Sequence, residues 1–419
     1  MDGRMRVAIG QFNEVTHERL TFAKQLGVGG IQLNSPVLPG AARWEEADLR
    51  WLRTRCESYG LRLEAIENVP TTFYDKAMLG LPGRDEQIEN YQNTIRHMGR
   101  AGIPILGYHW MPTHVWRTSF TTLGRGGALV SSFDQDLARD QPLAHGLKEH
   151  PLLHGGAIDE DEMWANYRYF IQAVIPVAEE AGVTLAVHPD DPPVSFLGGI
   201  ARLFSSFAGF RRAVEDIAPS PNHGLDFCMG CWSEMGAEAG PGVIPAIRHF
   251  GRNGKIVYVH FRDVQGTVPR FQECFLGEGN VDIIAAMRAL KDVGSLASCS
   301  TTMCRTSSTT RSGDTAGGPT RRAISWRCWR RSTSSVKRRS QTPMSMCRIA
   351  FAPPVGDARR IGPHGRHAHD QRRASSSTVR NAGYTSSLRA SAGARRRDEA
   401  IRPARRSHSF CVPMNAASD

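Results

Sequence analysis

A break in composition near Gly294 constrains this chain more than any other feature of its sequence. Residues 1–294 hold 28 Lys+Arg against 35 Asp+Glu, a net charge of −7. Residues 295–419 hold 24 basic and 6 acidic residues, a net charge of +18, so the +11 of the whole chain comes from its C-terminal part. That part is rich in Ser, Thr and Arg and poor in aromatic residues, a composition that cannot bury a core. We therefore expect a folded domain in residues 1–294 and a disordered basic tail in residues 295–419.

The genetic code offers an explanation for the break. When the last base of each codon is regrouped with the first two bases of the next, residues 300–310 permit a run that begins Asp-Asp-His-Val-Pro-His. Residues 318–330 then permit a polar loop followed by Leu-Ala-Leu-Leu-Ala, an apolar helical stretch. We infer that the chain after about Gly294 is translated out of frame. The alternative is a genuine Arg/Ser-rich tail.

The first 294 residues alternate short apolar runs with amphipathic stretches, which is typical of strands alternating with helices. Long helices are predicted at residues 45–59, 84–101 and 160–181, and seven strands are predicted at residues 6–10, 31–33, 61–67, 104–110, 184–189, 224–228 and 255–262. This order implies a parallel sheet covered on both faces. Seven units predict an α/β fold of the (β/α)8 TIM-barrel type that lacks its eighth β/α unit. A doubly wound sheet is disfavoured, because no Gly-x-Gly-x-x-Gly turn follows the first strand.

Two further features concern the active-site loops and the compartment. Residues Thr113–Gly156 form a stretch too long for an ordinary barrel loop, and we expect it to be an active-site lid. The cysteines of the first 294 residues are scattered, which suggests a reducing cytoplasm rather than a disulfide framework. We find neither a secretory signal nor an apolar run approaching the roughly 18–20 residues of a membrane helix, so a cytoplasmic location is expected.

Three metal-ligand side chains stand at the ends of successive predicted strands. His188 ends the fifth strand, Cys228 the sixth and His260 the seventh. Barrel enzymes place their active sites at the C-terminal ends of the strands, so these side chains should converge. Two imidazoles and one thiolate suit a divalent transition ion. The alternatives are hydrogen-bonded surface histidines and a small buried cysteine, or half of a zinc or redox motif in Cys228-x-x-Cys231.

Other polar residues at strand ends are weaker candidates. His109 and Asp190 are hypothesised to be catalytic, whereas Glu67, Asp191 and Arg262 are hypothesised to bind substrate. Glu67 would accept hydrogen bonds from hydroxyl groups, and the planar fork of Arg262 would hold a carboxylate. Their alternatives are structural. The Asp-Asp-Pro run fits turn or capping chemistry, Arg262 could merely pair with Asp263, Glu67 could form a strand-end salt bridge, and the aromatic run around His109 could simply pack beneath a loop.

These segments resemble mannonate dehydratase, and the most specific similarity is the run Ile175–Pro193. The resemblance implies a metal-dependent (β/α)8 lyase that converts D-mannonate into 2-keto-3-deoxy-D-gluconate and water in glucuronate catabolism. It implies that Mn²⁺ or Fe²⁺ is held by His188, Cys228, His260 and a fourth ligand, an aspartate. The aspartate falls at the Thr301/Thr302 junction of the shifted frame, and an active-site tyrosine falls near Pro319/Thr320. Both are missing from this sequence, so we expect little or no turnover.

Two other functions remain open from the sequence. A related barrel could act as a metal-dependent sugar isomerase or epimerase, although those sites are usually rich in carboxylates and Cys228 argues against one. The basic tail could bind RNA nonspecifically through phosphate contacts. The expected partner is a small sugar acid, with no specific nucleic acid and no membrane, and a homo-oligomer is left open.

Overall fold

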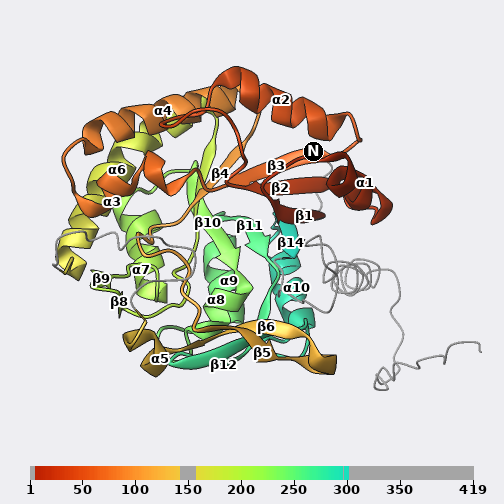
Figure 1. Ribbon diagram of the computed structural model, residues 1–419, viewed down its shortest axis with the longest axis vertical. Coiled ribbons are helices and arrows are strands. Elements are labelled where there is room, and N and C mark those ends of the chain that lie inside the picture. Colours follow the sequence, from red (N-terminus) through yellow and green to blue (C-terminus); the bar gives the residue numbers. More distant parts are fainter. Residues whose placement is uncertain (1–4, 142–156, 296, 302–419) are drawn as a thin grey trace, which may run out of the picture. The chain divides into compact units, whose positions relative to one another are not determined.

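Eight parallel strands form a closed barrel, which confirms the predicted TIM-barrel class (Figure 1). The computed structural model describes residues 5–141, 157–295 and 297–301. The barrel strands follow one another around the ring in chain order: β1 (Arg6–Phe12), β2 (Gly30–Asn34), β3 (Arg62–Glu67), β4 (Ile105–Tyr108), β7 (Thr184–Val187), β10 (His223–Cys228), β11 (Ile256–His260) and β14 (Ser298–Thr301). Their near-continuous burial is what a parallel sheet covered on both faces requires.

Helices connect the barrel strands: α1 (His17–Gln25), α2 (Glu46–Glu57), α4 (Arg84–Ala101), α6 (Glu160–Ala181), α7 (Phe207–Arg211), α9 (Val243–Arg252) and α10 (Ile283–Asp292). Shorter helical segments are α3 (Asp75–Leu79), α5 (Gln135–Arg139), α8 (Met229–Glu234), η1 (Thr71–Phe73), η2 (Arg125–Gly127) and the π-helical η3 (Arg212–Ile217). The bounds of α4 and α6 equal those predicted, because Gly102 and Gly182 end them in the left-handed conformation, at φ 74° and 66°. No helix among the described residues is long and apolar enough to cross a bilayer.

The strand β14 contradicts the prediction that the barrel lacks its eighth strand. Cys299 lies opposite Val7 of β1 on one side and Val259 of β11 on the other, with parallel pairing to both. Backbone groups form this ladder whatever side chains the strand carries, and the Cys299 side chain is buried in the core. The strands β1 and β11 therefore each have a parallel neighbour on both sides. The helix of the eighth unit and the basic tail lie outside the described residues, and the division at residue 294 stays a prediction.

A four-stranded antiparallel sheet is built from two excursions of the chain. The hairpin β5 (Ser119–Leu123) and β6 (Leu129–Asp134) comes from the stretch predicted to be a lid, and β12 (Asp263–Thr267) and β13 (Arg270–Cys274) follow β11. β6 pairs with β13, which joins the excursions in the order β12-β13-β6-β5. A short pair, β8 (Phe196–Leu197) and β9 (Ile200–Ala201), completes the strands. The described part of the predicted lid is thus hydrogen-bonded into a sheet.

Candidate active site

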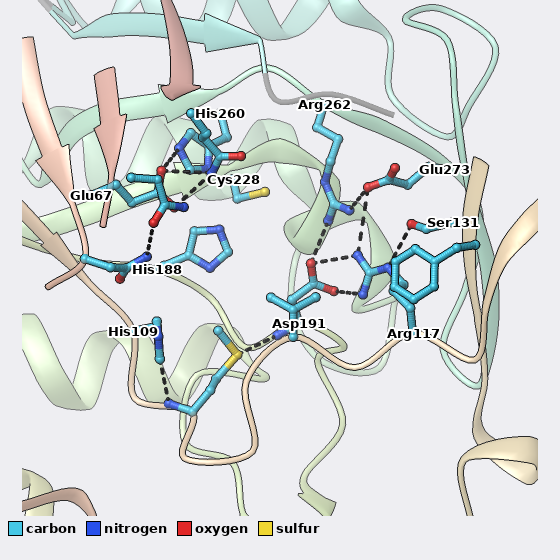
Figure 2. A pocket seen from close by; sticks show the side chains of 16 residues that line it. Glu67, His109, Arg117, Ser131, His188, Asp191, Cys228, His260, Arg262 and Glu273 are labelled. Atoms are coloured by element: carbon cyan, nitrogen blue, oxygen red, sulfur yellow. Dashed lines mark hydrogen bonds and ion pairs between the residues drawn. The ribbon is translucent and has the colours of Figure 1, made fainter. Parts of the chain in front are cut away.

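A cavity of about 250 Å³ lies at the C-terminal ends of the barrel strands (Figure 2). One side is lined by residues at or just beyond strand ends, including Gln11, Asn34, Glu67, His188, Cys228 and His260. The other side includes Arg117, Phe120, Ser131 and Glu273 from the antiparallel sheet and the segment that leads into it. The predicted convergence of strand ends and the loop insertion therefore contribute to one site.

The structure brings His188, Cys228 and His260 together at this cavity. The rings of His188 and His260 lie 5.3 Å apart between centroids. Potential ligand atoms of His188, Cys228 and Cys231 all lie within 4.8 Å of one another. A second group that meets the same limit consists of Glu67, His188, Asp226 and His260, so His188 belongs to both groups.

Several atoms of this cluster lack ordinary hydrogen-bond partners. Both ring nitrogens of His260 and both carboxylate oxygens of Asp226 are buried without a hydrogen bond. His260 Nε2 lies 3.0 Å from Glu67 Oε2, and its Nδ1 lies 3.5 Å from Asp226 Oδ1. Buried polar atoms normally have partners, and orphaned ones mark a place for water or an ion. Imidazole, thiolate and carboxylate donors are the set that borderline divalent ions take, so the residues fit a metal centre.

The electrostatics of the cluster also favour a cation. Burial by itself would raise the pKa of the Cys228 thiol, but a hydrogen bond with Cys231 and the nearby Arg262 hold that pKa well below its usual range. Burial opposes protonation of His188, yet the negative charges of Asp226 and Cys228 raise its pKa to about 9. The lowered pKa of Cys228 favours its thiolate form, and the negative charge at the site attracts a cation. A divalent ion would take the place of those imidazole protons.

Two buried arginines and their carboxylate partners form the other side of the cavity. Arg117 donates two hydrogen bonds to the two oxygens of Asp191, at 2.5 and 2.7 Å. Arg262 donates to Glu273 at 2.8 Å and to Glu234 at 2.5 Å, and it lies 3.5 Å from Asp191. Burial would raise the pKa of Asp191, but the two arginines outweigh it and lower the pKa to about 2. Asp191 and Arg262 thus share one ionic network, and Arg262 pairs with carboxylates other than Asp263.

His109 lines the cavity in a defined tautomer. The backbone N–H of Met111 donates to His109 Nδ1 at 3.3 Å, which leaves the ring proton on Nε2. Burial, followed by the positive neighbours His114, His188 and Arg202, holds the pKa of His109 well below its usual range. His109 is therefore a neutral imidazole that can donate one hydrogen bond from Nε2.

Asp190, hypothesised to be catalytic, does not lie among the residues that line the cavity. Its Oδ2 accepts a hydrogen bond from the backbone N–H of Phe204 at 2.6 Å, and Arg202 lies 4.0 Å from Oδ1. Burial raises the pKa of Asp190 to about 7, although Arg202 opposes the shift. The side chain is fully buried and anchors the loop that follows β9. A structural role therefore fits Asp190, but its hydrogen bond reaches a residue fourteen positions away and is neither the turn nor the capping contact given as the alternative.

Comparisons with known proteins decide the family. The family model of D-mannonate dehydratase (UxuA) matches residues 5–302, well over half of the chain. The chain belongs to the mannonate dehydratase family. Mannonate dehydratase 2 of Halalkalibacterium halodurans is 33% identical over 309 residues, which cover 69% of this chain and 88% of the relative. Mannonate dehydratase of Thermotoga maritima is 32% identical over 294 residues, covering 64% of this chain and 79% of the relative.

Solved structures agree on the fold. The crystal structure of mannonate dehydratase from Streptococcus suis superposes with a TM-score of 0.70 at 24% identity, covering 83% of this chain and all of that one. A structure of L-ribulose 3-epimerase reaches a TM-score of 0.51 at 18% identity and shares the fold alone. Mannonate dehydratases are hydro-lyases, so this is an enzyme family. The matches favour neither the isomerase or epimerase alternative nor RNA binding by the tail.

The end of the eighth strand is one of two positions where this chain differs from what the mannonate dehydratase resemblance implies. The eighth strand reads Ser298-Cys299-Ser300-Thr301 and is followed by another threonine, so it carries no carboxylate. The acidic side chains that do meet the metal-ligand cluster come from β3 and β10, as Glu67 and Asp226. Gln11 of β1 donates to both oxygens of Glu67, at 3.0 and 2.9 Å.

Proposed function

We propose that the cavity binds D-mannonate and supports its dehydration to 2-keto-3-deoxy-D-gluconate, with slow turnover in this chain. The observation that carries this proposal is that a buried cluster of metal donors and a pair of buried arginines line one small cavity. A sugar acid has hydroxyl groups that could bind a metal ion in the donor cluster. Its carboxylate could bind either that ion or the arginine pair. At about 250 Å³ the cavity suits a small molecule rather than a polymer.

His188, Cys228 and His260 are the residues that we propose to hold Mn²⁺ or Fe²⁺. Their support is the shared cavity, the lowered pKa of the Cys228 thiol and the buried nitrogens of His260, which face carboxylates without a hydrogen bond. Such an ion would supply Lewis-acid stabilisation of the negative charge that develops when the C2 proton is lost. The chain's own contribution to that step is to fix three donors on the ends of adjacent barrel strands.

The arginine pair would orient the substrate. Asp191 holds Arg117 through a bidentate contact, and Glu234 and Glu273 hold Arg262, so both guanidinium groups are fixed before a ligand arrives. Pre-positioned cations reduce the ordering cost of binding an anion. His109 would donate its Nε2 proton in a hydrogen bond to a substrate hydroxyl, because Nδ1 already accepts from Met111.

Proton abstraction is the step for which this chain is poorly equipped. Among the described cavity residues, each carboxylate is already engaged: Glu67 with Gln11 and His260, Asp191 with Arg117, and Glu273 with Arg262. The neutral tautomer of His109 offers a donor to the cavity rather than a base. The aspartate and tyrosine that the resemblance places after the eighth strand are missing from the sequence. Slow turnover follows, because a positioned acid or base typically contributes about 10²–10⁴ in rate.

The test is production of 2-keto-3-deoxygluconate from D-mannonate by the full chain with Mn²⁺. We expect product formation that is slow, that depends on Mn²⁺ and that disappears in His188→Ala. A thermal melt of His188→Ala checks that the variant is folded. Turnover equal to that of a catalytically complete relative would overturn the argument from missing residues. Failure to bind D-mannonate in the presence of Mn²⁺ would overturn the proposed substrate.

A further inference from the structure

We propose that Glu67 is the carboxylate ligand that completes the metal site of this chain, in place of an aspartate at the end of the eighth strand. The inference rests on the proposed metal-dependent function and adds a ligand on β3, which lies two strands from β7 and directly across the barrel from β11. It concerns the residues of this chain alone, since its eighth strand has no carboxylate to offer.

The barrel geometry allows Glu67 to reach the other ligands. In the strand order β1-β14-β11-β10-β7-β4-β3-β2, β3 and β11 are four places apart in a ring of eight, so they face each other across the barrel. Glu67 ends β3 and His260 ends β11, and their side chains meet with Oε2 at 3.0 Å from Nε2. Ligand atoms of these two residues and His188 all lie within 4.8 Å of one another. An ion among them would be held from opposite walls (Figure 2).

Burial and charge show why Glu67 needs such a cation. Its side chain is 4% exposed, and its ion-pair partner among the described residues is His260. A histidine that ligates a metal is neutral, so it would no longer balance the carboxylate. An ionised carboxylate buried without a positive partner is strongly destabilising. A divalent ion between the two removes this conflict, because it binds the imidazole and the carboxylate together.

The environment of Glu67 resembles that of a metal-ligating carboxylate. Gln11 donates hydrogen bonds to both carboxylate oxygens, at 3.0 and 2.9 Å, and so fixes the plane of the group. Carboxylates that bind metals are themselves held by such outer hydrogen bonds. The amide is neutral, so it orients Glu67 without neutralising it.

Asp226 is placed for a different task. It faces the other ring nitrogen of His260, with Oδ1 3.5 Å from Nδ1, and it does not line the cavity. Metal-ligating histidines commonly turn their second nitrogen toward a carboxylate, which orients the ring. The two nitrogens of the His260 ring therefore indicate different roles for the two carboxylates. Glu67 lies on the Nε2 side and binds the ion together with His260, whereas Asp226 lies on the Nδ1 side and orients the ring.

The test compares metal binding by the full chain and three variants, using Co²⁺ and Mn²⁺ in calorimetry and the visible absorption of bound Co²⁺. Glu67→Gln keeps the size of the side chain and removes the charge. We expect it to lower Co²⁺ affinity by more than about 100-fold, beyond the roughly 10–100-fold typical of outer-shell groups, and to change the Co²⁺ spectrum. Asp226→Asn should lower affinity less and leave the spectrum nearly unchanged.

Glu64→Gln is the matched control. Glu64 lies on the same strand, is equally buried and pairs with Arg6 instead of the cluster, so its loss should leave Co²⁺ affinity unchanged. If Glu67→Gln unfolds, Glu67→Ala with added acetate replaces it, and acetate should restore Co²⁺ binding.

The outcomes separate the two proposals. Wild-type affinity and spectrum in Glu67→Gln, with only weaker D-mannonate binding, would assign Glu67 to the substrate and overturn this inference while the proposed function stands. A lowered Co²⁺ affinity of Glu67→Gln, with an unaltered spectrum at saturating Co²⁺, would also overturn it, because the coordination would then lack Glu67. An absence of metal binding by the unmodified chain would overturn the proposed function itself.

Discussion

The buried pair of Arg117 and Asp191 gives the sharpest stability prediction. Asp191→Asn keeps the shape of the side chain but removes the charge that Arg117 meets through two hydrogen bonds. The side chains of Arg117 and Asp191 are 3% and 7% exposed, so water cannot replace the lost partner. Arg262 keeps Glu234 and Glu273, whereas Arg117 keeps only a longer ion pair with Glu273, at 4.0 Å. The weakened pairing of Arg117 should therefore account for most of the loss in the free energy of unfolding.

Two estimates give the loss in the free energy of unfolding caused by Asp191→Asn. Removing one partner of a buried ion pair costs about 3–5 kcal/mol. The pKa of Asp191 is about 2, against about 3.9 for an unfolded aspartate, which corresponds to roughly 2–3 kcal/mol. We expect a loss of about 3 kcal/mol in the free energy of unfolding, from a total of about 5–15 kcal/mol. Because the folded pKa is the lower one, this contribution is present above pH 4 and is lost as the pH falls toward 2.

Urea unfolding followed by circular dichroism at pH 7 and at pH 3 measures both effects. The free-energy difference between the wild type and Asp191→Asn should be about 3 kcal/mol at pH 7 and smaller at pH 3. Asp190→Asn is the matched control, since its amide oxygen can still accept the hydrogen bond from Phe204. It should cost less than about 1 kcal/mol. Equal effects of the two substitutions, or a difference independent of pH, would refute the reasoning.

Three further predictions test other parts of the account. In Gly230→Ala the new Cβ would lie 2.7 Å from Arg262 Cζ and displace the guanidinium group. We therefore expect about tenfold weaker D-mannonate binding in calorimetry. Unchanged affinity would contradict the proposed role of Arg262. A chain ending at Gly294 loses β14, which leaves the edges of β1 and β11 unpaired, so it should aggregate in size-exclusion chromatography. A chain ending at residue 302 should stay monodisperse. Identical behaviour of the two chains would show that β14 is dispensable. Mn²⁺ at 100 times its Kd should stabilise the wild type by about 2.7 kcal/mol in urea and leave His260→Ala unaffected, and equal stabilisation would place the ion elsewhere.

Much of the fold could be predicted because its signals are local. The helices α4 and α6 have long amphipathic periods and end at glycines that adopt the left-handed conformation, so their bounds follow from the sequence. The strand β14 could not be predicted in the same way. Ser298-Cys299-Ser300-Thr301 has little apolar character, and it forms a strand because β1 and β11 offer backbone groups on both sides. The pairing partners, rather than the segment itself, determine this element.

Some residues of the candidate site could likewise be predicted from the sequence, whereas others depend on tertiary structure. His188, Cys228 and His260 end parallel strands, and parallel strand ends meet at one end of a barrel, so sequence order alone brings them together. Arg117 could not be found, because it enters the cavity from a segment whose antiparallel pairing the sequence pattern does not reveal. The position of Glu67 was predicted, but its contact with His260 depends on the two strands facing each other across a closed ring.

The asymmetry between the neighbouring aspartates shows a limit of reasoning from motifs. Asp190 and Asp191 are adjacent and chemically identical, and both were hypothesised to serve the site. In the structure one accepts a backbone hydrogen bond and the other pairs with two arginines, so burial raises the pKa of Asp190 to about 7 while ion pairing lowers that of Asp191 to about 2. Tertiary contacts alone separate them.

The central claim is that a divalent ion binds at the C-terminal end of this barrel, and anomalous diffraction at the manganese edge tests it most directly. A crystal of the full chain grown with Mn²⁺ should show one strong peak within bonding distance of His188, Cys228, His260 and Glu67. A map with no peak in the cavity, or with its strongest peak away from these four side chains, would contradict the account.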